Sequence, residues 1–374
     1  MQRSPPGEAQ KENPDSVGAE TGVQGIEALP SRVDRYGKAK NKALEVAEYM
    51  GGVPGLQRTA ETLQGCGEYL VFRHYWSVDQ VKLHGARLCK KHLLCPLCAI
   101  RRGAKALAAY LARWEAIKAE KTALRPFLVT LTVKDGPDLE ERFKHLQKAQ
   151  HELWKRKHRG RGSVLAGVAG AVWSYEVKRG SGSGLWHPHL HMIALAENAP
   201  DQVELAAEWK SITGDSHVVD VRPISEVDPV SGFIEVFKYA VKFSDQGPED
   251  TVHAWRTLAG KRLLASAGCF RGVEVPDELM DDVAGLEGLP YVDLFFRFLG
   301  RGYSLVQRKA GAGETKPARE PAPARPIDED RIGRAEQHRR VLEDRLYLAQ
   351  SLARRQPPGA SGSRQQAKRR AVSP

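Results

Sequence analysis

The stretch that decides the fold is WHPHLHMIAL, which spans residues 186–195. Its apolar second half is typical of a buried β-strand, in which successive side chains point to opposite faces of the sheet. His189 and His191 therefore project together, while Leu190 points into the core. Two imidazoles on one face can grip a metal ion. For a His-x-His pair taken alone, however, the polar face of an ordinary half-buried strand is the simpler interpretation.

A strand before this stretch favours the metal interpretation. Residues 172–178 (VWSYEVK) have strand character, and residues 180–184 (GSGSG) supply the turn of a hairpin. If the turn is centred on Gly182-Ser183, Glu176 lies opposite His189 and shares its face, whereas a bulge would move it to the other face. One carboxylate and two imidazoles, with coordination positions left open, suit Mg²⁺ or Mn²⁺ acting as a Lewis acid on a phosphate better than structural zinc.

Length and charge limit the class of protein. The 374 residues can bury a sizeable core, and the net charge of +11 is typical of a nucleic-acid partner, although a basic tail alone could produce it. We find no apolar run long enough to span a bilayer, and residues 1–30 have no hydrophobic signal core. We therefore expect a cytoplasmic protein without a membrane partner.

The cysteines form a candidate zinc site. Cys95 and Cys98 make a Cys-x-x-Cys knuckle, and Cys89 with Cys66 would complete a four-sulfur site for structural Zn²⁺. Three histidines could replace Cys66 as the fourth ligand: His74, His84 and His92. A redox Cys-x-x-Cys is the competing interpretation, but the expected βαβ surroundings are missing. Loss of such a metal should unfold the module.

The elements beyond the knuckle predict the fold class. A strand at 126–133, a helix at 139–161, the two hairpin strands, a helix at 201–212 and a strand at 218–221 follow in that order. This βαββαβ order is the ferredoxin-like arrangement of the α+β class, an antiparallel sheet with helices on one face. The opposite face would then be free for a ligand.

Four regions follow from composition and periodicity. We expect a disordered N-terminus at 1–30, a helical, cysteine-rich module at 31–120, the sheet domain at 121–307, and a linker with a basic tail at 308–374. The tail contains a helical pattern over 328–355. After the knuckle, three basic residues could hold DNA phosphates, with ordinary solvent exposure as the alternative: Arg101, Arg102 and Lys105.

A second candidate group lies beyond the last predicted strand. Residues 233–243 (FIEVFKYAVKF) have a helical pattern that puts Glu235, Tyr239 and Lys242 on one stripe. A phenol becomes a useful nucleophile beside a cation, which Lys242 could supply, and Glu235 could act as a general base. An amphipathic helix with ordinary surface charges is the alternative.

Together these motifs resemble the rolling-circle plasmid replication initiators of the HUH endonuclease superfamily. The strand at 127–133 resembles their first motif, 187–191 their metal motif, and Glu235, Tyr239 and Lys242 their tyrosine motif. Residues 89–102 resemble a cysteine-rich segment that many initiators carry upstream, and 260–264 resemble a downstream stretch more weakly. The resemblance covers about residues 34–275.

The resemblance implies a catalytic sheet domain and a mechanism. Tyr239 would attack a phosphodiester of single-stranded or extruded origin DNA, forming a 5′-phosphotyrosyl bond and freeing a 3′-OH for a host polymerase. His189 and His191, with Glu176 or the competing His187 as third ligand, would hold the metal. Glu235 would activate water for the terminating cleavage. Because the sequence has no Gly-x-x-x-x-Gly-Lys-Ser/Thr loop, unwinding would need a host helicase.

Two other interpretations stay open. Another HUH enzyme, such as a relaxase or a single-tyrosine transposase, would use the same chemistry on a different substrate. A non-catalytic zinc protein that binds nucleic acid would keep the histidine hairpin as a structural feature only. The cysteine module favours the initiator over the relaxase. The oligomeric state is left open, a homodimer included.

Overall fold

The computed structural model describes residues 25–159, 162–238 and 246–311. All of them lie within one compact unit, which spans Met1–Glu314. The helical pattern at 328–355 and most of the predicted N-terminal and C-terminal tails lie outside the described residues. Among the described residues, no helix combines the length and apolar character that a membrane span needs.

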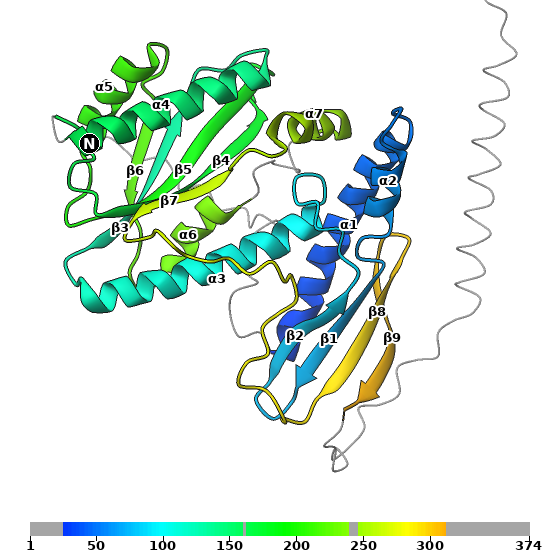
Figure 1. The fold of residues 1–374 in the computed structure, drawn as a ribbon. Coiled ribbons are helices and arrows are strands. Elements are labelled where there is room, and N and C mark those ends of the chain that lie inside the picture. The colour runs from blue at the N-terminus through cyan, green and yellow to red at the C-terminus, as the bar shows by residue number, and fades with distance from the viewer. Residues whose placement is uncertain (1–24, 160–161, 239–245, 312–374) are drawn as a thin grey trace, which may run out of the picture. The chain divides into compact units, whose positions relative to one another are not determined.

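An antiparallel five-stranded sheet forms the centre of the α+β fold, with strand order β6-β3-β5-β4-β7 (Figure 1). Its strands are β3 (Arg125–Thr132), β4 (Gly170–Arg179), β5 (Trp186–Ala196), β6 (Val219–Pro223) and β7 (Leu264–Gly268). Helices α4 (Leu139–Arg159) and α5 (Gln202–Thr213) follow β3 and β5 along the chain. The element order from β3 to β6 is therefore the predicted one, and β7 is an unpredicted fifth strand.

The hairpin register is confirmed. Glu176 pairs with His189, Ser174 with His191, and Arg179 with Trp186 at the turn. No bulge interrupts this ladder, so Glu176 and both histidines share one face.

The two faces of the sheet are covered by different helices. Tyr175 of β4 packs its ring against Phe143 of α4, with 5.3 Å between the ring centroids. The preceding residue of the strand, Ser174, points to the opposite face. On that face its hydroxyl donates to the carbonyl of Val236 in α6 (Pro229–Phe237). The face predicted to be free is therefore partly covered by α6, because its apolar residues Phe233 and Val236 are buried.

A second sheet was not predicted. Its order is β2-β1-β8-β9, formed by β1 (Tyr69–Tyr75), β2 (Gln80–Ala86), β8 (Val292–Leu299) and β9 (Gly302–Ala310). Because β1 pairs with β8, the predicted boundary between a module at 31–120 and a domain at 121–307 is wrong for this sheet. Strand β9 also extends into the region predicted as linker from residue 308.

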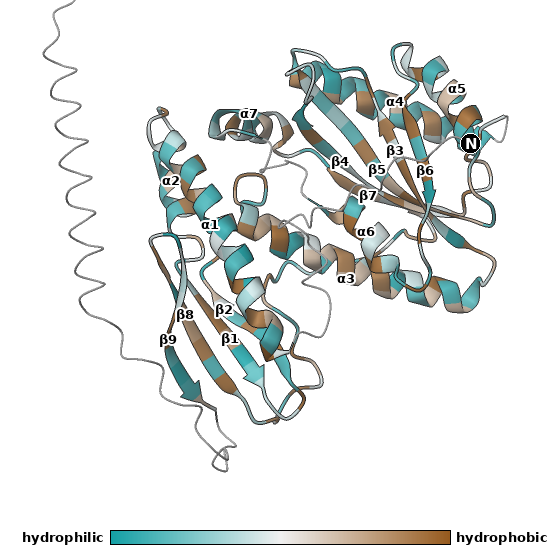
Figure 2. Cartoon of the chain, turned by 180° about the vertical axis from the view of Figure 1, so that it is seen from behind, coloured by the Kyte–Doolittle hydropathy of each residue, from teal (hydrophilic) through white to brown (hydrophobic). Residues whose placement is uncertain are grey.

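Helices support both sheets. They are η2 (Ile26–Ala28), α1 (Leu29–Gly51), α2 (Gln57–Gln64), α3 (Pro96–Glu120) and α7 (Pro248–Leu258). Helix α3 packs against both α1 and α6. Figure 2 shows hydrophobic residues along the strands of both sheets. Strand β8 contributes Leu294 to the buried core.

A buried ion-pair network joins α1, α3 and β2. The Asp281 carboxylate accepts hydrogen bonds from Arg32 at 2.8 Å, from Arg101 at 2.5 Å and from the backbone N–H of Leu83 at 2.5 Å. Burial alone would raise the pKa of Asp281, but the two guanidinium groups outweigh it and hold that pKa well below its usual range. The network stabilises the packing of segments that are far apart in the sequence.

Candidate functional site

One carboxylate and two imidazoles meet on the α6 side of the five-stranded sheet. The ligand atoms of Glu176, His189 and His191 lie within 4.8 Å of one another. His189 Nε2 is 3.5 Å from Glu176 Oε1, and His191 Nε2 is 3.6 Å from Oε2. These distances are long for hydrogen bonds. Ligand atoms held about 2.1 Å from one ion are separated by about 3.0–3.5 Å, so the group fits a single metal ion with little adjustment.

The second nitrogen of each imidazole has its own partner. Thr130 Oγ1 of β3 lies 3.1 Å from His191 Nδ1, directly across the strand pair. His189 Nδ1 lies 3.4 Å from the carbonyl oxygen of His187. Such partners fix the ring orientation and leave Nε2 free to bind a metal ion. Sequence analysis missed Thr130, because only the register between β3 and β5 brings it to His191.

The charge of Glu176 also favours a cation. Its side chain is 9% exposed. Burial would raise its pKa, but the interactions with the nearby His189 and His191 rings outweigh burial and hold the pKa well below the usual range. A buried carboxylate that stays ionised needs positive charge beside it, which a bound divalent ion supplies.

His187, the competing third ligand, has a different partner. Its Nδ1 lies 2.5 Å from Asp135 Oδ1, and it is not a member of the three-residue group. Asp135 also accepts a hydrogen bond from the Ser183 hydroxyl at 2.5 Å. Burial would raise the pKa of Asp135, but its bonds to Ser183 and His187 lower it. The structure therefore groups a ligand atom of Glu176, and not one of His187, with those of His189 and His191.

The predicted helix at 233–243 is shorter than expected. Helix α6 ends at Phe237, and Lys238 has an extended backbone with ψ of 179°. The stripe that would join Glu235 to Tyr239 and Lys242 required an uninterrupted helix, so that argument is wrong. Tyr239 and Lys242 lie outside the described residues. Glu235 forms an ion pair with Lys238, which the sequence analysis did not single out.

Helix α6 is hydrogen-bonded to the sheet beside the metal group, which consists of Glu176, His189 and His191. Ser174 Oγ donates to Val236 O at 2.5 Å, and Ser174 pairs directly with His191. The Phe237 ring stacks on Tyr110 of α3, with 5.1 Å between centroids. The last residues before Tyr239 are therefore held on the sheet face that carries Glu176.

Four cysteines gather in a second group. The sulfur of Cys66 is 3.5 Å from that of Cys95 and 3.6 Å from that of Cys98, and Cys89 Sγ is 3.5 Å from Cys98 Sγ. Tetrahedral zinc with bonds of about 2.3 Å separates its sulfur ligands by about 3.8 Å. Of the four candidates for the fourth ligand, the structure brings Cys66 to the group, whereas His74 lies 3.0 Å from Asp79.

The electrostatics of the cysteine group fit a cation as well. Hydrogen bonds from the neighbouring thiols lower the pKa of Cys89, and the bond from Cys66 has the largest effect. Lys40 of α1 is 2% exposed, and its ammonium donates to the carbonyl of Gln64. Burial lowers the pKa of Lys40, and the nearby Cys66 opposes that shift. A four-thiolate zinc site is negatively charged, so a buried lysine beside it is a fitting counter-charge.

Comparison with known proteins assigns the family. A family model described as "Replication protein" matches residues 80–288, more than half of the chain and both candidate sites except Cys66. The chain belongs to this replication protein family. Its resemblance to plasmid replication initiators is thereby confirmed, and the HUH superfamily is consistent with it.

Curated relatives of this replication protein agree. A "Protein rep" of Bacillus sp is 28% identical over 265 residues, covering 61% of this chain and 84% of the relative. Others are from Lactiplantibacillus plantarum (26% over 280 residues, 67% and 84%) and Streptococcus pneumoniae serotype 2 (25% over 252 residues, 62% and 76%). No solved structure matches the chain significantly.

The three basic residues after the knuckle of this replication protein have different surroundings. Arg101 is 1% exposed and bonds Asp281, the carbonyl of Leu279 and the Tyr36 hydroxyl. The prediction that Arg101 contacts DNA is therefore wrong, because its guanidinium is committed to the core. Arg102 is exposed, and Lys105 is half-buried.

Proposed function

We propose that this replication protein starts rolling-circle replication of a plasmid by nicking one strand of origin DNA through Tyr239, and later ends it by strand transfer. The observation that carries the proposal is the position of Glu176, His189 and His191 on the sheet face to which α6 is bonded. The order β6-β3-β5-β4, with a helix after β3 and another after β5, supports the proposal of a ferredoxin-like sheet.

Chain length supports Tyr239 as the nucleophile. Val236 is bonded to Ser174, and Tyr239 follows three residues later. Consecutive Cα atoms are about 3.8 Å apart, so the Cα of Tyr239 can be at most about 11 Å from that of Val236. Ser174 and Glu176 are two residues apart on one strand face, which is about 7 Å. A phenol side chain can therefore reach a phosphate held at the metal group.

The chain's own residues would perform most of the nicking step. The phenolic oxygen of Tyr239 attacks phosphorus and forms the 5′-phosphotyrosyl bond, while the bond from phosphorus to the 3′-oxygen breaks. The phenol loses one proton and the 3′-oxygen gains one, so the transfer is neutral in protons. Glu176, His189 and His191 would hold Mg²⁺ or Mn²⁺, which supplies Lewis-acid polarisation of the phosphate. Thr130 would keep the His191 ring in position.

Glu235 would act in termination. Its carboxylate is half-buried on α6, is paired with Lys238, and would accept a proton from water. The water would then attack a phosphodiester in the second cleavage. Lys238 lies one residue before Tyr239 and, like Lys242, could supply the cation beside the nucleophile.

The remaining parts of the proposal concern the module and the partners. The four cysteines would hold one structural Zn²⁺ that keeps α2, β2 and α3 together. The DNA substrate would be single-stranded or extruded at the origin, and a host helicase and polymerase would continue replication.

Covalent capture of DNA tests the proposal. The purified protein is incubated with a labelled single strand from the nick region of the parent plasmid and Mn²⁺, and the adduct is mapped by mass spectrometry. We expect a phosphotyrosine link at Tyr239 and no adduct with Tyr239→Phe, which should still bind DNA. An adduct on Tyr291 or Tyr303, or none at all, would contradict the assignment.

A further inference from the structure

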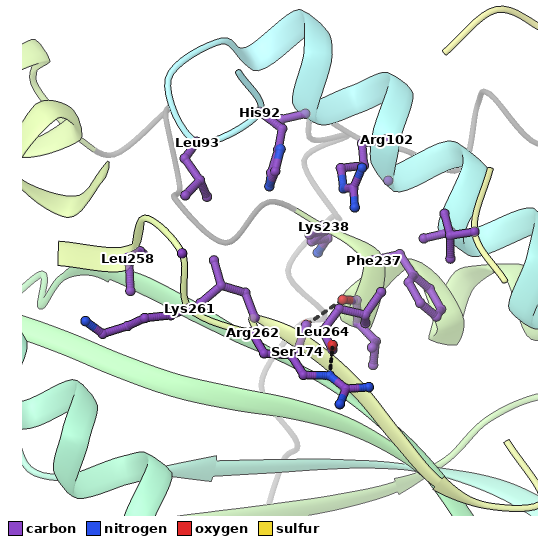
Figure 3. A pocket seen from close by; sticks show the side chains of 17 residues that line it. His92, Leu93, Arg102, Ser174, Phe237, Lys238, Leu258, Lys261, Arg262 and Leu264 are labelled. Atoms are coloured by element: carbon purple, nitrogen blue, oxygen red, sulfur yellow. Dashed lines mark hydrogen bonds between the residues drawn. The ribbon is translucent and has the colours of Figure 1, made fainter. Parts of the chain in front are cut away.

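A cavity of about 340 Å³ adjoins the metal face of the sheet. In Figure 3, His92, Leu93 and Arg102 come from the knuckle and α3, Lys261 and Arg262 come from the segment before β7, and Lys238 follows α6. The floor is apolar and includes Phe237 and Leu264. The cysteine module and the catalytic sheet therefore both line the cavity.

The cavity carries a strong excess of positive charge. Among the described residues, its lining includes no Asp or Glu, but it includes Arg102, Lys238, Lys261 and Arg262. Two of these cations have acidic neighbours, since Lys238 pairs with Glu235, and Arg102 lies 3.7 Å from an Asp277 that is 93% exposed.

Lys261 and Arg262 make side-chain hydrogen bonds to backbone carbonyls, and Lys261 also interacts at longer range with the Glu140 carboxylate. Lys261 Nζ donates to the carbonyl of Thr257 at 2.6 Å, and Arg262 Nε donates to that of Leu264 at 3.4 Å. Within the described part of the chain, no ion pair involves either residue. Their remaining donors are available for an anionic ligand.

The cavity lies on the same sheet face as the metal group. Ser174 lines it and projects to the same sheet face as Glu176, two residues further along β4. Alternate residues of a strand are about 7 Å apart. An anion in the cavity would therefore lie beside, but not at, the phosphate held by Glu176, His189 and His191.

We propose that this cavity binds a backbone phosphate of the single DNA strand next to the one that is cleaved, through Lys261 and Arg262 with Arg102 facing them. This rests on the proposed function, because it assigns the path of the same substrate strand. The apolar floor accommodates the attached sugar or base, as in other sites that combine positive charge with apolar surface for single strands. The cysteine module is then part of the DNA-binding site through Arg102.

Salt-dependent binding tests the assignment. The probe is a fluorescent single strand of 20 thymidines, and all proteins carry Tyr239→Phe so that no covalent bond forms. For single strands, each phosphate contact contributes about 0.7 to the slope of log K against log salt. Because the two cations hold one phosphate between them, the double variant Lys261→Ala/Arg262→Ala should lower the slope by about 0.7 and weaken binding about fivefold at 0.1 M salt.

A matched control removes the same charge elsewhere. Lys148→Ala/Arg159→Ala changes two exposed cations of α4, on the opposite side of the sheet. It should change the slope much less than the cavity variant. Equal slopes for the two variants, or an unchanged slope for the cavity variant, would overturn the proposal. If Lys261→Ala/Arg262→Ala fails to fold, Lys261→Gln/Arg262→Gln replaces it under the same criteria.

Two further arms separate related explanations. A mononucleotide offers the same phosphate, so dTMP is titrated as a competitor; tight dTMP binding at the cavity with unchanged affinity for the strand would overturn the DNA assignment. Adduct formation is measured separately with unmodified Tyr239. If an adduct forms but the cavity variant leaves the salt slope unchanged, the cavity proposal alone is refuted. If the cavity variant lowers the salt slope but no adduct forms, the nicking mechanism alone is refuted.

Discussion

Replacing Thr130 by valine should lower the affinity of the metal group for a divalent ion without unfolding the sheet. The hydroxyl oxygen of Thr130 is 3.1 Å from His191 Nδ1, and valine keeps the β-branched shape while removing that oxygen. His191 would lose the partner that fixes its ring with Nε2 toward Glu176. Loss of such an outer partner typically weakens metal affinity by about 10–100-fold, which is about 1.4–2.8 kcal/mol.

The assay counts free Mn²⁺ by electron paramagnetic resonance while the protein is titrated, so it does not depend on DNA cleavage. Thr132→Val is the matched control, because Thr132 pairs with His189 in the same ladder but its hydroxyl donates to the carbonyl of Val218 at 3.2 Å. We expect the Mn²⁺ dissociation constant to rise for Thr130→Val and to stay within about twofold for Thr132→Val. Equal effects of the two substitutions would refute the role of Thr130.

Three further predictions concern the cysteine group, the ion-pair network and termination. Cys66→Ser should release about one zinc ion per chain and lower the helical signal of the module, as measured by a colorimetric chelator and circular dichroism; retained zinc would show that another residue completes the site. Asp281→Asn should lower the free energy of unfolding in urea by about 3 kcal/mol at pH 7, because it removes the carboxylate to which the buried guanidinium groups of Arg101 and Arg32 both bond. Because the folded-state pKa of Asp281 is depressed, its contribution is present above its unfolded pKa of about 3.9 and is lost as the pH falls through the folded value, so the two proteins should converge in acid. Glu235→Ala should still form the first adduct but accumulate unterminated product on gels, and normal termination would remove Glu235 from that role.

The sequence was most informative where contacts are local. The Gly-Ser turn at 180–184 connects two adjacent strands, so its length sets the register that brings Glu176 opposite His189. The Cys-x-x-Cys knuckle is likewise a local motif, because one helix start carries both Cys95 and Cys98. These short-range features were sufficient to predict the three-residue group and most of the cysteine group.

Contacts between distant segments were not predictable in this way. Strand β1 pairs with β8 in a register that joins Tyr69 to Arg297, and no periodicity within either segment identifies the other. Arg101 looked like a surface cation because its partner Asp281 is 180 residues away. Helix α6 ends at Phe237 without a glycine or proline to mark the stop, so its apolar pattern suggested a longer helix.

The pairing of β1 with β8 has a consequence for synthesis on the ribosome. About 200 residues separate the end of β2 from the start of β8, and translation at about 5–20 residues per second takes about 10–40 s to cover them. During that interval the β1–β2 hairpin exposes an open edge, and an isolated two-stranded hairpin is marginally stable at best. The five-stranded sheet can therefore form before β8 is synthesised and pairs with β1. Until then the unpaired edge of β1 is the place where a chaperone would protect the nascent chain from aggregation.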